Sequence, residues 1–213
     1  MPEREELRRA VLGWLERVAD NQDLSPALEP RALTDASRLA AVLRPGDDDL
    51  QSRNVLGWLY YYRCLGGRAH DLDAAIEILV PCFIAGEDGL PEDLLPLLVT
   101  DAIGPATALL GQAAAEGDPG LVRAAADLWG RIVNVLPVRD PCRPGLLASF
   151  GIAMRASYAL TEDPADLEAA IAADLEAAVA AREAAGADAG LPEAARKQAR
   201  ASSGSAGGGR MWA

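Results

Sequence analysis

Apolar side chains recur along this chain at the three- and four-residue spacing of a helix that buries one face. A stripe with a period of 3.6 residues predicts an amphipathic helix. No segment alternates with the period of two that is typical of a half-buried strand. The pattern therefore predicts an all-α protein. The clearest stripes are Leu7, Val11, Leu12, Trp14, Leu15 and Val18, and then Leu72, Ile76, Leu79 and Phe83.

The same five-residue string, Val-Leu-Gly-Trp-Leu, occurs at residues 11–15 and again at residues 55–59. An apolar residue followed by glycine recurs at Ile103-Gly104 and at Phe150-Gly151, which indicates a repeat of about 47 residues. A glycine inside a helix costs about 1 kcal/mol relative to alanine. We therefore expect each repeated glycine to let a second helix approach closely.

A second signature follows the last three glycines and resembles the start of another helix, at residues 71–76, 120–125 and 166–171. Two of these segments are preceded by Asp-Pro, at Asp118-Pro119 and Asp163-Pro164. Aspartate caps a helix, and proline fits the first turn because its missing N–H has no partner there. Each repeat is therefore predicted to be a helical hairpin.

The predicted units cover residues 4–44, 49–85, 92–136 and 144–185, within one repeat domain of residues 1–186. The first helices are expected at 4–20, 50–65, 92–115 and 145–160, and the second helices at 34–44, 71–85, 119–136 and 165–185.

Two kinds of segment interrupt this pattern. Pro81, Pro96 and Pro105 fall inside expected helices, so kinks or breaks are predicted there, above all at Gly104-Pro105. Residues 187–213 are rich in glycine, alanine and serine and are predicted to be a flexible tail.

Charge and composition narrow the choice of partner and location. The chain has 213 residues and a formal net charge of -12. This charge repels phosphate backbones and anionic membrane surfaces, so neither nucleic acid nor a membrane is an expected partner. A signal peptide and a continuous apolar run of roughly 18 residues are both missing, which favours a cytoplasmic protein.

The residues that could carry chemistry are few. The single histidine, His70, precedes Asp71 at an expected turn, and no further metal ligands are near it in sequence. Residues 47–49 are three aspartates that lack the ligand spacing of a calcium loop, so we interpret them as charges at a helix N-terminus. The three cysteines have no Cys-x-x-Cys spacing. No catalytic, cofactor or metal site is predicted.

One expected helix is unusually rich in aromatic and polar side chains. Because successive residues point around the whole circumference of a helix, these side chains cannot all face one core. Some of them pack between repeats, and others are predicted to line a peptide groove formed by the first helices. The candidate partner-binding residues are Arg53, Asn54, Trp58, Tyr60, Tyr61 and Arg63.

Leu56-Gly57-x-x-Tyr60 resembles the first helix of a tetratricopeptide repeat (TPR), and Ala75-x-x-x-Leu79 resembles the second. The period is longer than the standard 34 residues. Residues 143–155 and 163–171 are more similar to the long TPR-like repeats of actinobacterial proteins, which often precede a caspase-like CHAT protease domain. The similarity covers roughly residues 50–185, is weak in the third unit, and departs from the family at Ser149-Phe150.

The resemblance implies a short right-handed α-solenoid of about four hairpins that binds proteins. The function expected from it is a non-enzymatic protein- or peptide-binding module, a scaffold or regulator, for example of a CHAT-type effector on another chain. One alternative is an all-helical small-ligand binder or enzyme that uses Trp58, Tyr60 and Tyr61. Another is a truncated relative of a repeat-protease protein.

Overall fold

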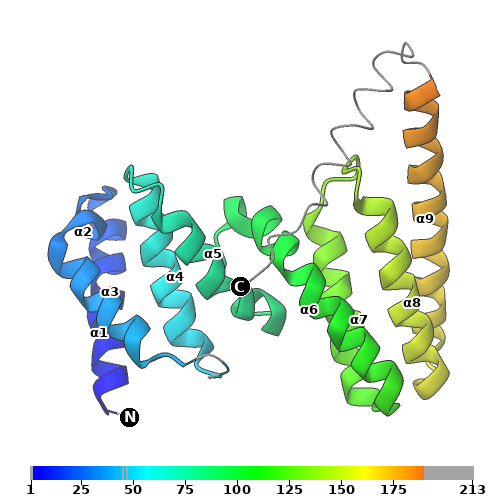
Figure 1. Cartoon of the computed structure of the whole chain (residues 1–213), viewed down its shortest axis with the longest axis horizontal. Helices are drawn as coiled ribbons and strands as arrows, with labels where there is room; N and C mark the ends of the chain where they lie inside the picture. Colours follow the sequence, from blue (N-terminus) through cyan, green and yellow to red (C-terminus); the bar gives the residue numbers. More distant parts are fainter. Residues whose placement is uncertain (1, 45, 47, 190–213) are drawn as a thin grey trace, which may run out of the picture. The chain divides into compact units, whose positions relative to one another are not determined.

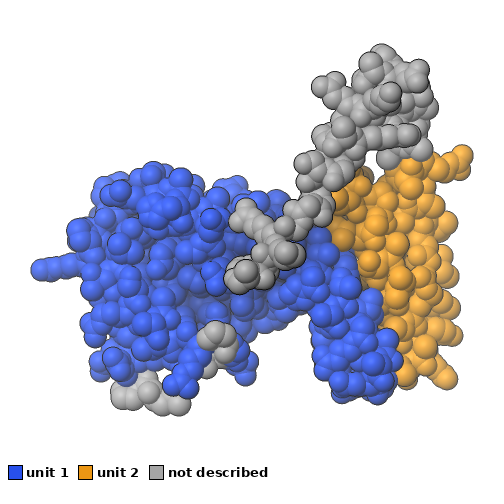
Figure 2. Space-filling model, viewed as in Figure 1, with its two compact units in different colours: residues 1–135 blue, residues 136–213 orange. Residues whose placement is uncertain are grey.

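The computed structural model of the chain describes residues 2–44, 46 and 48–189, and its regular structure in this part is entirely helical (Figure 1). The all-α prediction is therefore confirmed. The chain divides into two compact units, residues 1–135 and residues 136–213 (Figure 2). Most of the predicted tail, from residue 190 onward, lies outside the described residues.

Each predicted hairpin is present as two neighbouring helices. The first unit contains α1 (Pro2–Asn21), α2 (Ser25–Leu28), α3 (Pro30–Val42), α4 (Leu50–Leu65), α5 (Asp71–Ala85), the 3-10 turn η1 (Glu92–Leu94), α6 (Leu95–Glu116) and α7 (Pro119–Val135). The second unit contains α8 (Arg143–Thr161) and α9 (Pro164–Ala189). Helices α4 and α5 begin and end at the predicted residues, whereas the short helix α2 was not predicted.

Both Asp-Pro pairs begin helices as predicted. Helix α7 starts at Pro119, and the Asp118 carboxylate accepts a hydrogen bond from the N–H of Gly120 at 2.7 Å. Helix α9 starts at Pro164, and the Asp163 carboxylate accepts one from the N–H of Ala165 at 3.0 Å. The same local chemistry therefore starts the second helix of two hairpins.

The prolines interrupt the helices less than the sequence predicts. Helix α5 continues through Pro81, and helix α6 continues through Gly104-Pro105, so the expected break at that pair is wrong. Pro96 lies in the first turn of α6, where a missing N–H costs nothing.

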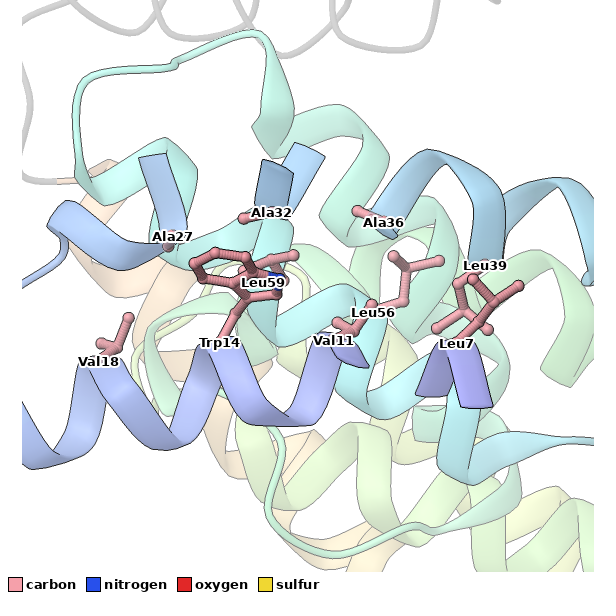
Figure 3. Close-up of a cluster of buried hydrophobic side chains, with 10 residues drawn as sticks. All are labelled: Leu7, Val11, Trp14, Val18, Ala27, Ala32, Ala36, Leu39, Leu56 and Leu59. Atoms are coloured by element: carbon pink, nitrogen blue, oxygen red, sulfur yellow. The ribbon is translucent and has the colours of Figure 1, made fainter. Parts of the chain in front are cut away.

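The core of the first unit forms where α1 packs against α2, α3 and α4 (Figure 3). The stripe on α1 faces small side chains of α2 and α3, which allow the helices to lie close together. Leu12, which belongs to the predicted stripe, is 40% exposed, so the buried stripe is narrower than expected. The core side chains are Leu7, Val11, Trp14, Val18, Ala27, Ala32, Ala36, Leu39, Leu56 and Leu59.

Helix α6 is unusually apolar. Residues 92–116 contain an 18-residue stretch whose length and mean hydropathy, 1.6, would allow it to cross a membrane, by length and composition alone. The segment is not a continuous apolar run, because Thr100 and Asp101 interrupt it. Within the first unit α6 packs against α5 and α7 and buries Leu98 and Ala102. Only 28% of the most apolar 18-residue stretch is buried by this packing.

The repeated glycines differ in how closely the second helix of the hairpin approaches them. A Cβ atom added to Gly57 would lie 2.4 Å from Cγ of Leu79, and one added to Gly151 would lie 2.7 Å from an oxygen of Asp174. Leu79 and Asp174 each lie eight residues after the aspartate near the start of the second helix. No atom lies within 4 Å of a Cβ added to Gly13 or Gly104. Close approach is therefore confirmed in the second and fourth hairpins and is wrong in the first and third.

The two copies of the Val-Leu-Gly-Trp-Leu string form a matched pair for a stability measurement. We expect Gly57→Ala to lower the free energy of unfolding by about 1–3 kcal/mol, because the new methyl overlaps Leu79. We expect Gly13→Ala to raise it by about 0.5–1 kcal/mol, because alanine favours the helix and meets no neighbour. Urea unfolding followed by circular dichroism measures both, and equal effects of the two substitutions would contradict the close approach.

Candidate functional site

Helix α4 is held at its N-terminus by an aspartate cap. One Asp49 oxygen accepts a hydrogen bond from the N–H of Ser52 at 3.0 Å, and the other accepts from its hydroxyl at 2.8 Å. Burial opposes ionisation of Asp49, but these bonds and the nearby guanidinium groups of Arg4 and Arg8 outweigh it and lower the pKa of the carboxyl. Asp49 therefore lies at a helix N-terminus, as predicted for this cluster, and it also caps the helix, whereas Asp47 lies outside the described residues.

Near the end of α4, a buried arginine joins three helices. Arg63 is only 4% exposed. Its Nε donates to a carboxylate oxygen of Asp71 in α5 at 2.8 Å, and its Nη1 donates to the carbonyl of Ala27 in α2 at 3.0 Å. His70 is exposed, with its Nε2 3.2 Å from the other Asp71 oxygen. Arg63 therefore cannot serve as the partner-contacting residue predicted from the sequence, because its guanidinium is inside the fold.

The fourth hairpin has a related contact at the equivalent positions. Ser157 lies six residues after Gly151, as Arg63 does after Gly57, and its hydroxyl donates to the buried Asp166 at 2.6 Å. Asp166 and Asp71 each precede the leucine near the start of the second helix. Both hairpins therefore join their two helices by a buried hydrogen bond to this aspartate.

Other aromatic and polar side chains of α4 hold the segment that leads to α6. The Tyr61 hydroxyl donates to Asp93 at 2.9 Å, and burial together with this carboxylate raises the pKa of Tyr61 to about 12. Trp58 Nε1 donates to the carbonyl of Gly89 at 2.7 Å, and the Asn54 amide donates to the carbonyl of Asp88 at 3.4 Å. The Trp58 ring also packs against Tyr61 and Tyr62, with ring centres 5.9 and 5.3 Å away. These aromatic contacts support the packing interpretation of the cluster.

A groove opens between α3, α4 and α5, with a volume of about 540 Å³. We call it the α3–α5 groove. Its walls are mostly apolar, and its polar groups are Arg53 and Tyr60 from α4 and Glu77 from α5. The lining residues are Ala40, Leu43, Gly46, Arg53, Leu56, Tyr60, Ala74, Glu77, Ile78 and Pro81.

Arg53 is only partly satisfied by the fold. One terminal nitrogen of Arg53 donates to the carbonyl of Arg44 at 2.8 Å, while its Nε is buried and has no hydrogen-bond partner within the described residues. Burial and the negative charge of Asp71 raise the pKa of Tyr60, against smaller opposing effects of Arg63 and Ser37. The groove thus carries a fixed cation and a neutral phenol beside an apolar wall.

A second, shallower groove of about 390 Å³ lies between α1 and α4. Its charged side chains already pair with one another, because Arg8 and Arg9 both contact Glu5, at 2.6 and 3.2 Å. Any ligand would have to replace these contacts, so this groove is the weaker candidate. Its lining residues are Glu5, Arg8, Arg9, Leu12, Gln51, Asn54, Val55 and Glu87.

The six predicted binding residues therefore do not share one surface. Arg53 and Tyr60 line the α3–α5 groove, Asn54 lines the other groove, and Trp58, Tyr61 and Arg63 hold neighbouring segments in place. The α3–α5 groove lies between α3 and α5, which are the second helices of their hairpins. The prediction that Arg53 and Tyr60 line a groove formed by the first helices is therefore wrong. Glu77 and Ile78 complete the α3–α5 groove and were not predicted, because their sequence resembles any amphipathic helix.

Comparison of the chain with protein-family models, with curated proteins and with solved structures gave no match. The described residues also contain no group of three histidine, cysteine or carboxylate side chains that could hold a metal ion, and their cysteines are free thiols.

The buried arginine generates a prediction about stability. We expect Arg63→Ala to lower the free energy of unfolding by about 3–5 kcal/mol, because it leaves the Asp71 carboxylate buried without its partner. Arg68→Ala, at an exposed position in the following turn, should change it by less than about 0.5 kcal/mol. Denaturant titration of both variants measures this difference, and a small effect of Arg63→Ala would show that the pair is not formed.

Proposed function

We propose that this protein is a non-enzymatic interaction module that binds a peptide segment of another protein in the α3–α5 groove. The observation that carries the proposal is the mostly apolar α3–α5 groove of about 540 Å³, which Arg53, Tyr60 and Glu77 line with polar groups. A groove of this size that combines an apolar wall with a few polar groups is typical of ligand-binding sites.

The chemistry of the groove defines the peptide that fits it. Leu43, Ile78 and Pro81 offer an apolar wall for one or two aliphatic or aromatic side chains. Arg53 favours a carboxylate beside them, because charge-assisted hydrogen bonds to guanidinium are among the strongest. Glu77 on the same wall repels a second acidic group. The preferred ligand is therefore an apolar residue next to a single carboxylate.

We further propose that the hairpins are TPR-like repeats. The support is that the second and fourth hairpins make the same two contacts at the same positions of their sequences. In each, the glycine lies against the residue eight positions after the buried aspartate, and a side-chain donor binds that aspartate. Helical repeats of this kind commonly present grooves to peptides. A scaffold or regulatory role follows from this proposal.

A small-molecule ligand is the second candidate. The groove volume of about 540 Å³ lies within the range of about 300–1,000 Å³ typical of small-ligand sites. The aromatic cluster does not form the wall of such a site, because Trp58 and Tyr61 bind the segment before α6 instead. A small apolar acid would use the same Arg53 and Tyr60 contacts as the peptide.

A random peptide library displayed on phage and selected against the full chain tests the proposal. We expect the enriched peptides to share an apolar residue beside a carboxylate. Arg53→Gln should weaken binding of such a peptide by about tenfold or more, because a hydrogen bond to a charged group contributes about 1.5–3 kcal/mol. Tyr60→Phe should weaken it less, because only a hydroxyl is lost. Fluorescence anisotropy with a labelled synthetic peptide measures each affinity.

The control is Arg68→Gln, which removes one positive charge from an exposed position outside the groove. It should leave peptide affinity unchanged. Enriched peptides without a carboxylate, or equal losses for Arg53→Gln and Arg68→Gln, would contradict the proposed site. Failure to enrich any peptide, together with binding of small apolar acids that depends on Arg53, would favour the second candidate.

A further inference from the structure

Helix α9 leaves a row of large apolar side chains exposed. Ile171, Leu175 and Val179 are 52%, 64% and 56% exposed, and they follow one another at four-residue spacing. Residues with this spacing lie on one face of a helix. The buried Ala170 and Ala173 lie on roughly the opposite face, toward α8. We call Ile171, Leu175 and Val179 the α9 stripe.

Charged residues bound the α9 stripe symmetrically. Glu168 lies seven residues before Leu175, and Arg182 lies seven residues after it. Both side chains are exposed, and neither makes an ion pair within the part of the chain that the structure describes. If the helix is turned end to end about Leu175, Glu168 and Arg182 therefore exchange places. Ile171 and Val179 exchange places as well, and Leu175 stays where it is.

We infer that two copies of the chain associate through this stripe, with their α9 helices antiparallel and a two-fold axis beside Leu175. In this arrangement Leu175 meets Leu175 of the second copy, and Ile171 meets Val179 of the second copy on either side. Each Glu168 then faces an Arg182. A two-fold interface uses the same patch on both subunits, so that each contact occurs twice.

Charge favours a second copy of the chain as the partner and the antiparallel direction of the two α9 helices. A parallel pairing would place Glu168 beside Glu168 and Arg182 beside Arg182, and like charges that face each other disfavour association. The net charge of -12 repels a second copy at long range, but salt screens this repulsion beyond about 8 Å at physiological ionic strength. The antiparallel pairing places opposite charges at the contact, where screening is least. This inference does not depend on the proposed function.

The size of the stripe sets the expected strength. From Glu168 to Arg182 the helix is about 21 Å long at 1.5 Å per residue. Interfaces that bury less than about 1,200 Å² in total are weak or transient, so we expect a dimer that dissociates on dilution from about 1 mM to about 10 µM. Sedimentation velocity of the full chain over this range measures it.

The first variant tests the stripe itself. Leu175→Asp should abolish the dimer, because it places two carboxylates at the two-fold axis. Its circular dichroism spectrum and melting temperature should not change, because Leu175 is mostly exposed. The matched control is Leu97→Asp on α6, where the leucine is 42% exposed. This control should dimerise like the unmodified chain.

Charge reversal tests the antiparallel direction. Glu168→Arg alone and Arg182→Glu alone should each weaken the dimer, because each places like charges opposite one another twice. The double variant should restore it. An equimolar mixture of the two single variants should form a heterodimer, because every arginine then faces a glutamate.

Three results would overturn the inference. A chain that stays monomeric at about 1 mM, where even an association worth only about 4 kcal/mol is half formed, excludes the dimer. A dimer that survives Leu175→Asp uses another surface. A dimer that is lost with Leu175→Asp but is not restored in the double variant uses the stripe in another direction.

Discussion

A buried positive charge must be neutralised, and in the first unit this requirement determines how α4 is placed. A buried ion is costly unless it is paired and hydrogen-bonded. Arg63 meets the requirement with two partners on two different helices, the Asp71 carboxylate in α5 and the Ala27 carbonyl in α2. These partners restrict the rotation of α4 about its own axis.

The consequence for function is that different side chains of α4 have different roles. Gly57 turns toward Leu79 and lets α5 approach, while Trp58 and Tyr61 bind the segment before α6. Arg53 and Tyr60 are the side chains left to line the α3–α5 groove. A helix with aromatic and polar side chains on several faces can therefore hold several neighbours and still leave one face for a ligand.

The sequence predicted the helices well and the site poorly, for physical reasons. Helices α4 and α5 have strong local signals, since Asp49 caps the first and Gly86 ends the second in the left-handed conformation. Helix α2 was missed because four residues carry no periodicity. The identical strings around Gly13 and Gly57 predicted identical packing, but only Gly57 has a helix against it.

Arg53 and Arg63 show why the binding site could not be predicted from the sequence. Both arginines lie on one helix ten residues apart, and their local sequences do not reveal which one is buried. The difference comes from long-range partners, since Ala27 is 36 residues away from Arg63. Only the arrangement of three helices therefore distinguishes a structural arginine from one that lines a groove.

The most direct test of this account is a double-mutant cycle on Arg63 and Asp71, with each residue changed to alanine alone and then together. If the buried pair orients α4, the two substitutions should be strongly coupled, with an interaction energy of about 2–3 kcal/mol in the free energy of unfolding. Additive effects within about 0.5 kcal/mol would show that the two residues act independently. That result would contradict the proposed basis for the orientation of α4 and of the groove beside it.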